Sequence, residues 1–215
     1  MASKQELLQF WKERGVDDIL LTAFSKVPRE NFISPQLKIH AYDDHPLPTM
    51  RNQSISQPST IIIMLRALDL QAGESVFEIG AGAGYQAALM ADLVGEQGKI
   101  VTTEVIPELV QVARQRMDEL KLNNVLVVEG DGAGGYTTQA PYDKIIITAA
   151  CPGIPQPLIA QLKEGGIIVA PVGDLQSQTM VKGKKENGKL SLEFLGDFTF
   201  VPMKGKYGFE KMGYK

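Results

Sequence analysis

Cysteine, histidine and long apolar runs are scarce in this sequence, and each scarcity argues against a class of protein. Cys151 is the only cysteine, so we expect neither an internal disulfide nor a cysteine cluster for a metal. His40 and His45 are the only histidines, which argues against a zinc site of the usual kind, and no metal is expected. No stretch of about 20 apolar residues is present, so no segment is expected to span a membrane.

Positive charge is also in slight deficit. The 22 Lys and Arg residues against 25 Asp and Glu give a net charge of -3. This balance argues against binding nucleic acid mainly by neutralising phosphates. The segment from Met1 to Trp11 is polar and lacks the apolar core of a secretory signal. We therefore expect a cytoplasmic monomer with no nucleic-acid or membrane partner.

The 215 residues, 44% of them hydrophobic and 22% charged, suit one soluble globular domain. Apolar residues at helical spacing predict two helices within the first 26 residues, and Val27-Pro28-Arg29-Glu30 ends the second. Residues 41–56 are rich in Asp, Pro, Asn, Gln and Ser, which predicts a loop. Residues 57–70 predict a further helix, with Pro58 in its first turn.

After Gly73 the pattern alternates between strand and helix. The expected strands are 75–79, 99–103, 125–128, 142–148 and 167–171, and the expected helices are 85–94, 107–120 and 156–162. Nearly continuous apolar strands joined by helices predict a mostly parallel sheet covered on both faces. We expect a turn at Gly165-Gly166, an antiparallel hairpin around Asn187-Gly188 and a last strand at 198–201.

A glycine-rich loop lies between the strand expected at 75–79 and the helix expected at 85–94. Gly80, Gly82 and Gly84 stand at alternate positions, where glycine permits positive φ and lets the backbone approach a ligand closely. The following helix offers its N-terminal amides. On the loop alone, a tight strand-to-helix turn that binds nothing is the less favoured alternative.

Glu78, just before this loop, helps to indicate the ligand. A dinucleotide would place a negatively charged pyrophosphate here, and its fingerprint has the third glycine three positions after the second. In this sequence Gly84 follows Gly82 by only two positions. S-adenosyl-L-methionine carries a sulfonium and an α-amino group, and a nearby carboxylate favours positive charge. Both features favour S-adenosyl-L-methionine over a dinucleotide.

Two more acids follow the next strands. Glu104 ends the strand at 99–103, where its carboxylate can accept hydrogen bonds from both ribose hydroxyls. Asp131 follows the third strand, where it can accept from the adenine amino group. Each acid alone could be a solvated loop residue, but the carboxyl ends of successive parallel strands meet at one crevice. Four neighbours at the strand ends are assigned to the same cofactor site: Ala81, Val105, Gly132 and Thr148.

A further tract is not explained by the cofactor. Gln53-Ser54-Ile55-Ser56-Gln57-Pro58, taken with the segments below, closely resembles the protein-L-isoaspartate O-methyltransferase family. The resemblance extends from Val27 to Val201 and is carried by residues 27–30, 78–86, 130–132, 140–143, 148–152, 171–173 and 200–202. The glycine loop is shared by many methyltransferases, whereas the Ser-Ile-Ser-Gln-Pro tract is far more particular to this family.

The resemblance implies a Rossmann-like α/β methyltransferase with an N-terminal helical extension and a C-terminal antiparallel hairpin. It implies methyl transfer from S-adenosyl-L-methionine, leaving S-adenosyl-L-homocysteine, to the free α-carboxylate of L-isoaspartyl residues in damaged proteins and peptides. The ester then cyclises without the enzyme to a succinimide, whose hydrolysis partly restores aspartate. The single domain would divide into an extension (residues 1–56), a cofactor-binding core (57–173) and a hairpin region (174–215).

Site residues carry over by position. Ser56 matches the active-site serine of the family, and Ser54 and Ile55 belong to the same substrate-facing segment. Gln53 and Gln178 are placed on the cofactor side. The isoaspartyl carboxylate, with a reference pKa near 4, is already ionised at pH 7 and needs no general base. Ser56 Oγ could therefore act by holding one carboxylate oxygen, although its place before Gln57-Pro58 also suits a helix N-cap.

This sequence departs from the family pattern at a few positions. Arg51-Asn52 stands where glycine is more frequent, Ala81 and Ala83 replace frequent hydroxyl residues, and Cys151 replaces a frequent alanine. Three other functions stay open on the sequence: a small-molecule methyltransferase, a cofactor-binding module without catalysis, and a dinucleotide oxidoreductase. An isoaspartyl peptide assay separates the first two from a repair enzyme, and binding of NAD would support the third.

Overall fold

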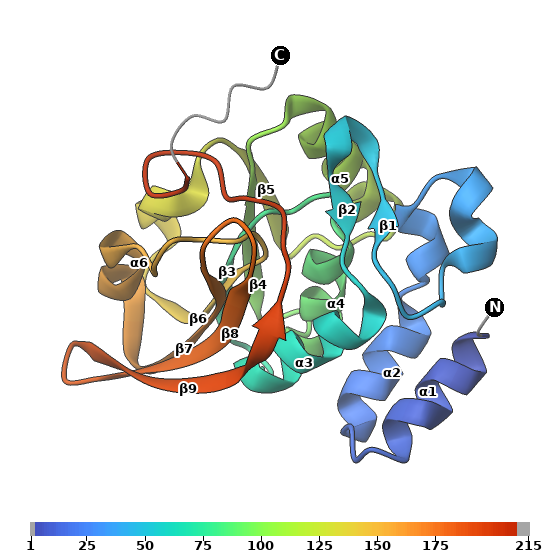
Figure 1. The fold of residues 1–215 in the computed structure, drawn as a ribbon, viewed down its shortest axis with the longest axis horizontal. Helices are drawn as coiled ribbons and strands as arrows, with labels where there is room; N and C mark the ends of the chain where they lie inside the picture. Colours follow the sequence, from blue (N-terminus) through green and yellow to red (C-terminus); the bar gives the residue numbers. More distant parts are fainter. Residues whose placement is uncertain (1–2, 210–215) are drawn as a thin grey trace.

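Seven strands form one sheet in the order β5-β4-β3-β6-β7-β8-β9 (Figure 1). The structure is a computed structural model that describes residues 3–209. The strands are β3 (Ser75–Ile79), β4 (Lys99–Glu104), β5 (Val125–Glu129), β6 (Tyr142–Ile147), β7 (Leu162–Gly173), β8 (Gln178–Glu186) and β9 (Lys189–Phe198). Strands β3 to β7 pair in parallel, whereas β7–β8 and β8–β9 are antiparallel. This confirms the predicted parallel sheet that ends in a hairpin.

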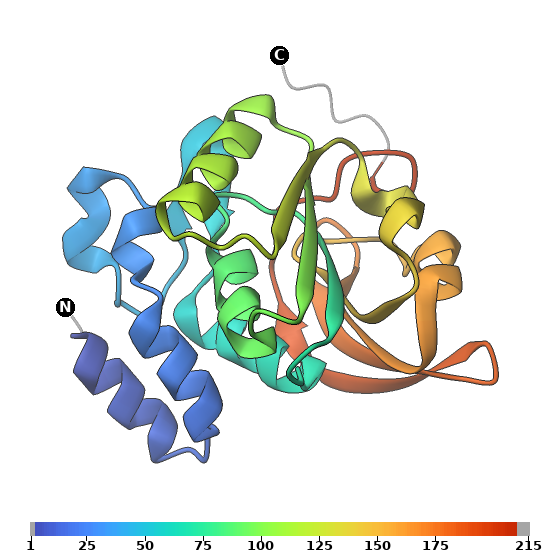
Figure 2. The same cartoon turned by 180° about the vertical axis from the view of Figure 1, so that it is seen from behind.

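Helices cover both faces of the sheet, as the strand pattern predicted. The helices are α1 (Lys4–Lys12), α2 (Asp18–Lys26), α3 (Pro58–Leu68), α4 (Tyr85–Val94), α5 (Pro107–Glu119) and α6 (Gln156–Gln161). Alternate residues of one strand face opposite sides, so Val76 packs with the α3–α5 side while Phe77 packs with the α6 side. Figure 2 shows α1 and α2 at one end of the molecule and the β8–β9 hairpin at the other.

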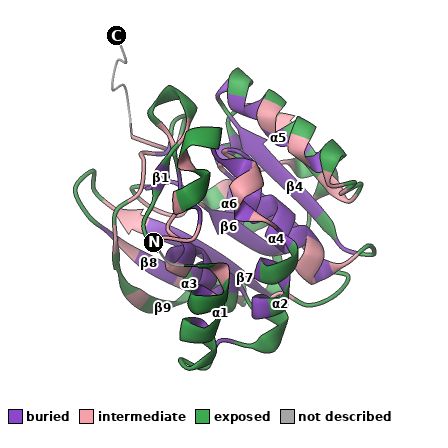
Figure 3. Cartoon of the chain, turned by 90° about the vertical axis from the view of Figure 1, so that its right-hand side faces the viewer, coloured by how far each residue is buried: buried purple, intermediate pink, exposed green. Residues whose placement is uncertain are grey.

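Burial follows these layers (Figure 3). The central strands and the inner faces of α3 and α4 are buried, and α5 exposes its outer face. Helix α4 consists almost entirely of buried residues because it lies between the sheet and the N-terminal helices. Within residues 3–209, every helix is too short or too polar to cross a bilayer.

Three predicted boundaries are wrong. Residues 41–56 contain a two-stranded ribbon, β1 (Leu47–Pro48) paired with β2 (Ser54–Ile55), in addition to loop. Gly165-Gly166 lies inside β7, which already pairs with β6 at Leu162, and a register shift accommodates the intervening residues. Residues 199–201 do not form a strand, since β9 ends at Phe198.

Short 3-10 turns complete the chain. They are η1 (Arg29–Phe32), η2 (Pro35–His40), η3 (Met50–Asn52), η4 (Gly132–Gly134) and η5 (Thr137–Gln139). Turn η3 forms the tip of the β1–β2 ribbon, and η4 follows β5. These two turns lie where chain segments reach the carboxyl edge of the sheet, and that edge carries the candidate site.

Candidate active site

The carboxyl ends of three neighbouring parallel strands meet at one edge of the sheet. Strand β3 lies between β4 and β6, and the chain winds in opposite directions on its two sides. In open α/β sheets such a switch point leaves a crevice that binds ligands. Ile79, Glu104 and Thr148, at or just beyond the three strand ends, all line the cavity found there.

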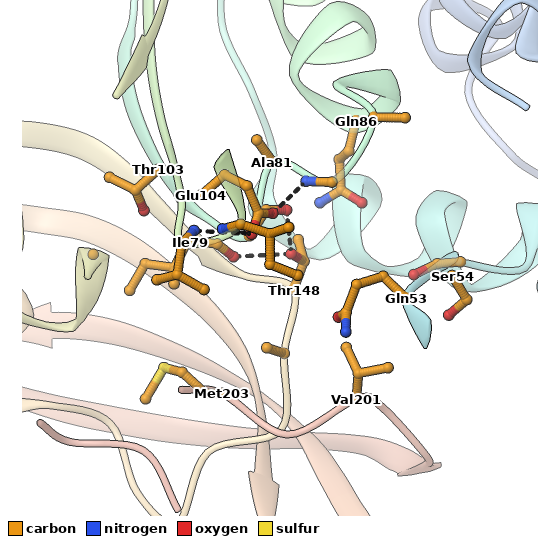
Figure 4. Close-up of a pocket in the computed structure, with 18 of the residues that line it drawn as sticks. Gln53, Ser54, Ile79, Ala81, Gln86, Thr103, Glu104, Thr148, Val201 and Met203 are labelled. Atoms are coloured by element: carbon orange, nitrogen blue, oxygen red, sulfur yellow. Dashed lines mark hydrogen bonds between the residues drawn. The ribbon is translucent and has the colours of Figure 1, made fainter. Parts of the chain in front are cut away.

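This cavity holds about 890 Å³ of empty space, part of it open to solvent. Figure 4 shows residues from the β1–β2 ribbon, Gln53 and Ser54, on one side and Glu104 and Thr148 on the other. The lining residues are 53–56, Ile61, 79–83, Tyr85, Gln86, 103–106, Gly130, Gly132, Thr148, Ala149 and 201–204.

The glycine loop has the backbone that its sequence predicts. Gly80, Gly82 and Gly84 have φ values of 95°, 54° and 91°. A side chain on Gly80 would meet Thr148 Oγ1 at 2.4 Å, whereas a Cβ at Gly82 would have no atom within 4 Å. Gly84 does not line the cavity. It lies against α5, where an added Cβ would meet Met117 Cε at 2.7 Å. Gly82 is therefore the loop position with open space around it.

Glu104 holds the loop and faces the cavity. Its carboxylate accepts hydrogen bonds from the amides of Gly82 (2.9 Å), Val105 (2.9 Å) and Ile106 (3.0 Å). A carboxylate has about four acceptor positions, so one remains, on Oε2. One ribose hydroxyl can donate there as the chain stands, and a second would have to replace an amide. The expected double ribose contact therefore requires the loop to move.

Glu78 lies beneath the loop and does not line the cavity. Its side chain is fully buried, Thr102 Oγ1 donates to Oε2 at 2.6 Å, and Oε1 has no partner among the described residues. Burial raises the pKa of Glu78 to about 8, and the nearby Glu104 carboxylate adds to the rise. Positive charge above the loop would favour the ionised form of Glu78. Glu78 therefore makes no direct contact with the cavity, and any electrostatic effect on a ligand would act through the loop.

Asp131 and Gln178 make hydrogen bonds within the chain. Asp131 accepts from the Ala133 amide (2.9 Å) and the Lys206 amide (2.8 Å), while its neighbours Gly130 and Gly132 line the cavity. The Gln178 side chain is buried, donates to the Asp174 carbonyl (2.6 Å) and accepts from the Phe200 amide (2.8 Å). Neither carboxylate nor amide reaches the cavity lining, in contrast to Glu104.

The tract 53–56 forms one wall of the cavity. Ser54 and Ser56 line both this cavity and an adjoining open groove beside α3, so they stand at the junction of the two. The N-cap of α3 is Gln57, without a side-chain cap hydrogen bond. The interpretation of Ser56 as the N-cap is therefore wrong, and its hydroxyl is left for other partners.

Sequence reasoning missed the opposite wall. Residues 201–204 cross the cavity mouth, where the Val201 carbonyl accepts from the Ala150 amide (2.8 Å) and the Met203 amide donates to the Ala150 carbonyl (2.8 Å). Gln86, in the first turn of α4, was also missed, and its buried Nε2 has no partner among residues 3–209. The 200–202 and 78–86 motifs were available signals, but neither motif says which of its residues face a ligand.

The residues present fit S-adenosyl-L-methionine. Gly82 leaves open space beside the loop, Glu104 has a free acceptor position, and the buried Gln86 amide has a free donor directed by α4. Apolar lining from Ile79 and Ile106 suits an adenine ring, and the Glu104 carboxylate favours a cationic ligand. An anionic group such as a pyrophosphate is disfavoured by the same carboxylate.

Comparison with known proteins gives a consistent result over nearly the whole chain. Residues 2–208 match the family model described as protein-L-isoaspartate(D-aspartate) O-methyltransferase (PCMT). The protein-L-isoaspartate O-methyltransferase 2 of Archaeoglobus fulgidus is 46% identical over 89% of this chain and 88% of the relative. The protein-L-isoaspartate O-methyltransferase of Methanococcoides burtonii is 44% identical over 94% of this chain and 100% of the relative.

Solved structures resemble this chain in fold as well. One protein-L-isoaspartate O-methyltransferase is 31% identical, with a TM-score of 0.88 over 96% of this chain and 67% of its own. A Plasmodium falciparum structure described with the same activity and with bound S-adenosyl-L-homocysteine has a TM-score of 0.82 at 22% identity. It covers 95% of this chain and 99% of its own, and it supports the fold alone.

Proposed function

The chain belongs to the protein-L-isoaspartate(D-aspartate) O-methyltransferase family and transfers methyl groups from S-adenosyl-L-methionine to isoaspartyl residues, and we propose that Ser56 and its neighbours position the accepting carboxylate. The observation that carries this proposal is the place of Ser56, which lines both the cofactor cavity and the groove beside α3. A group in the groove can meet a group in the cavity only at this junction.

The reaction requires little acid–base chemistry from the residues of the chain. S-adenosyl-L-methionine, when bound, supplies a methyl group on a sulfonium that needs no further activation. The free α-carboxylate of an isoaspartyl residue is ionised at pH 7, so no general base is required. What the chain contributes is placement of the reacting groups in line and removal of water from the carboxylate.

Hydroxyl groups at the junction suit this task. The Ser56 hydroxyl, free of any N-cap role, donates to one carboxylate oxygen and leaves the other oxygen to attack. Ser54, on the same wall, supplies a second polar contact, and Ile55 is buried and anchors the segment in the core. A hydrogen bond to a charged group contributes about 1.5–3 kcal/mol, enough to orient the carboxylate.

The cofactor side is formed by the strand ends. Glu104 Oε2 accepts from the ribose, the side chain of Gln86 binds a polar group of the cofactor, and Gln53 closes the wall near Ser54. Gly80, Ala81, Val105, Gly132 and Thr148 supply backbone and small side chains around it. Glu78, whose pKa is raised to about 8 by burial, would ionise more readily beneath the loop once a positive charge is bound above it.

A paired peptide assay tests the function. Two peptides identical except for an isoaspartyl or an aspartyl residue are incubated with the chain and with S-adenosyl-L-methionine labelled in the methyl group. We expect label in the isoaspartyl peptide alone, and recovery of aspartate after the base-labile ester is lost. Equal labelling of both peptides, or none, would contradict the function.

The same assay addresses the other functions left open by the sequence. Methylation of a small acid or phenol without peptide labelling would indicate a small-molecule methyltransferase. Tight binding of S-adenosyl-L-homocysteine without turnover on any peptide would indicate a binding module, and protection by NAD would indicate a dinucleotide enzyme. Each outcome differs from the pattern expected of a repair methyltransferase.

We further propose that the chain acts as one methyltransferase domain, as a monomer, in the cytoplasm. A single cysteine is typical of a reducing compartment. Net negative charge, -3 over the sequence, favours protein over nucleic-acid substrates.

A further inference from the structure

The wall of the cavity that carries Ser54–Ser56 is one arm of a short ribbon, which we call the pocket ribbon (residues 47–56). Its two arms pair antiparallel, Leu47 opposite Ile55 and Pro48 opposite Ser54. Two further bonds close the tip, since the Thr49 amide donates to the Gln53 carbonyl (2.8 Å) and the Gln53 amide to the Met50 carbonyl (3.2 Å). The geometry of the tip therefore determines where the substrate-facing arm lies.

The tip has an unusual backbone. Arg51 and Asn52 both have left-handed conformations, with φ values of 58° and 56°. Asparagine tolerates this region, but a long side chain such as that of arginine adopts it only where its surroundings hold it. One holding contact is the Gln53 side chain, whose Nε2 donates to the Arg51 carbonyl (3.2 Å). Gln53 itself lines the cavity, so the conformation of Arg51 is tied to a cavity wall.

A second contact holds the tip from the other side. The Arg51 guanidinium donates to Glu108 Oε1, in the first turn of α5. Helix α5 follows directly from Glu104, whose Oε1 accepts from the amides of Val105 and Ile106. Figure 1 shows the tip of the ribbon beside α5. The ion pair thus joins the substrate-facing wall to the strand end that carries the cofactor-side acid.

We propose that Arg51 is a positioning residue: its ion pair with Glu108 holds the pocket ribbon against α5 and thereby sets Gln53 and Ser54–Ser56 against the cofactor cavity. The effect that we infer on substrate binding rests on the proposed function, whereas the effect on cofactor binding rests on the cavity alone. Arg51 and Glu108 side chains are 64% and 45% exposed, so the pair is weak enough to open. Such a contact suits a wall that must release product.

The first test measures binding of S-adenosyl-L-homocysteine by calorimetry, which does not depend on turnover. We expect Arg51→Ala and Glu108→Ala each to weaken binding roughly two- to fivefold, the range of a partly exposed ion pair. The double variant should be no weaker than either single variant, and the charge-reversed pair Arg51→Glu with Glu108→Arg should recover most of the affinity. Salt should reduce the affinity of the unsubstituted chain more than that of Arg51→Ala.

A matched control is available on the hairpin. Lys184 and Glu186 form an ion pair of similar exposure, 54% and 52%, away from the cavity. Lys184→Ala should leave binding unchanged. Additive losses in the double Arg51/Glu108 variant, or equal losses in Lys184→Ala, would overturn the proposal, as would unchanged binding in both single variants.

Steady-state kinetics test whether Arg51 also affects the substrate. Arg51→Ala should raise KM for an isoaspartyl peptide severalfold with a smaller change in kcat, because the wall is displaced while the carboxylate needs no activation. A raised KM with unchanged binding of S-adenosyl-L-homocysteine would restrict the effect of Arg51 to the substrate and overturn the coupling. If the unsubstituted chain fails to methylate the peptide, the proposed function fails, while the calorimetric result still decides whether Arg51 positions the ribbon.

Discussion

Ser56 is the residue on which the proposed placement of the substrate carboxylate depends most. Its hydroxyl stands between cavity and groove and is not used to cap α3. Ser56→Ala should reduce kcat/KM for an isoaspartyl peptide about 10- to 100-fold, since a hydrogen bond to a carboxylate is lost. Binding of S-adenosyl-L-homocysteine should be kept. Ser191→Ala, at an exposed position on β9, serves as control, and an equal loss in that variant would contradict the role of Ser56.

Substitution of Glu104 should mainly weaken cofactor binding, in contrast to substitution of Ser56. Glu104→Gln replaces an acceptor oxygen by an amide group in a carboxylate that already accepts three backbone amides. We expect S-adenosyl-L-homocysteine to bind at least about 10-fold more weakly, from the loss of charged hydrogen bonds. The matched control is Glu129→Gln, because Glu129 pairs with Glu104 in register on β5 but is exposed. Calorimetry on both variants decides between a local and a general effect of charge.

For single residues, the sequence predicts which chemical group stands at a strand end better than it predicts what that group contacts. Glu104 follows from its place at a strand end, and the position of Ser56 follows from family resemblance. Asp131 stands at an equivalent strand end, yet its carboxylate caps the turn at Ala133 and binds the Lys206 amide. The second of these partners is 75 residues away in sequence, so no local pattern could reveal it.

Among the elements, α3 positions Ser56 from its own N-terminus. The Ser59 amide, in the first turn, donates to Asp44 Oδ1 (2.8 Å), and the buried Trp11 donates to Ser59 Oγ (2.9 Å). Asp44, in a distant loop, therefore accepts the hydrogen bond that an N-cap side chain usually accepts, since the Gln57 side chain makes no cap hydrogen bond. Trp11 and Asp44, in the N-terminal extension, thus hold the start of α3 although neither residue lines the cavity.

Asp44→Ala should therefore destabilise the fold by about 0.5–2 kcal/mol, as loss of a helix cap does, and raise KM for the peptide. Asp17→Ala is the control, because Asp17 is the N-cap residue of α2 but makes no cap hydrogen bond. Urea unfolding of both variants, with peptide kinetics, separates the two. A similar loss of stability in Asp17→Ala would show that the effect is not that of the Asp44 hydrogen bond.

The elements were predictable where one periodicity dominates. Strand β3 and helix α4 have the bounds read from the sequence, since apolar and alanine-rich runs are flanked by glycine. The pocket ribbon was not found, because its strands are two residues each and its tip depends on left-handed residues other than glycine. Likewise, Gly165-Gly166 looks like a turn, whereas tertiary pairing with β6 extends β7 across it.

For the whole molecule, the sequence predicts a parallel sheet but does not fix which strands are neighbours. The order β5-β4-β3-β6-β7 places the glycine loop at the centre of the sheet. The pairing of β3 with both β4 and β6 brings the ends of those strands to either side of β3, and so creates the crevice. Resemblance to a family implies that order, whereas composition and periodicity are equally compatible with others.

Stability of the whole chain should depend on pH through Glu78. Burial raises the folded-state pKa of Glu78 to about 8, above its ordinary value of 4.5. Between those two values the unfolded state releases the proton while the folded state keeps it. The unfolded state therefore binds fewer protons, and the free energy of unfolding falls as pH rises, by at most about 1.4 kcal/mol per unit. Below pH 4.5 this contribution to the slope vanishes.

Glu78→Gln isolates this effect, because glutamine keeps the acceptor for Thr102 Oγ1 and cannot ionise. Urea unfolding of both chains at several values between pH 5 and pH 8 should show stabilities that diverge, with the variant gaining relative to the unsubstituted chain as pH rises. Glu129→Gln, at an exposed site, should keep the parental slope. Parallel curves for Glu78→Gln would mean that Glu78 is already ionised in the folded chain. In that case a charged carboxylate lies beneath the glycine loop even before a cationic cofactor binds.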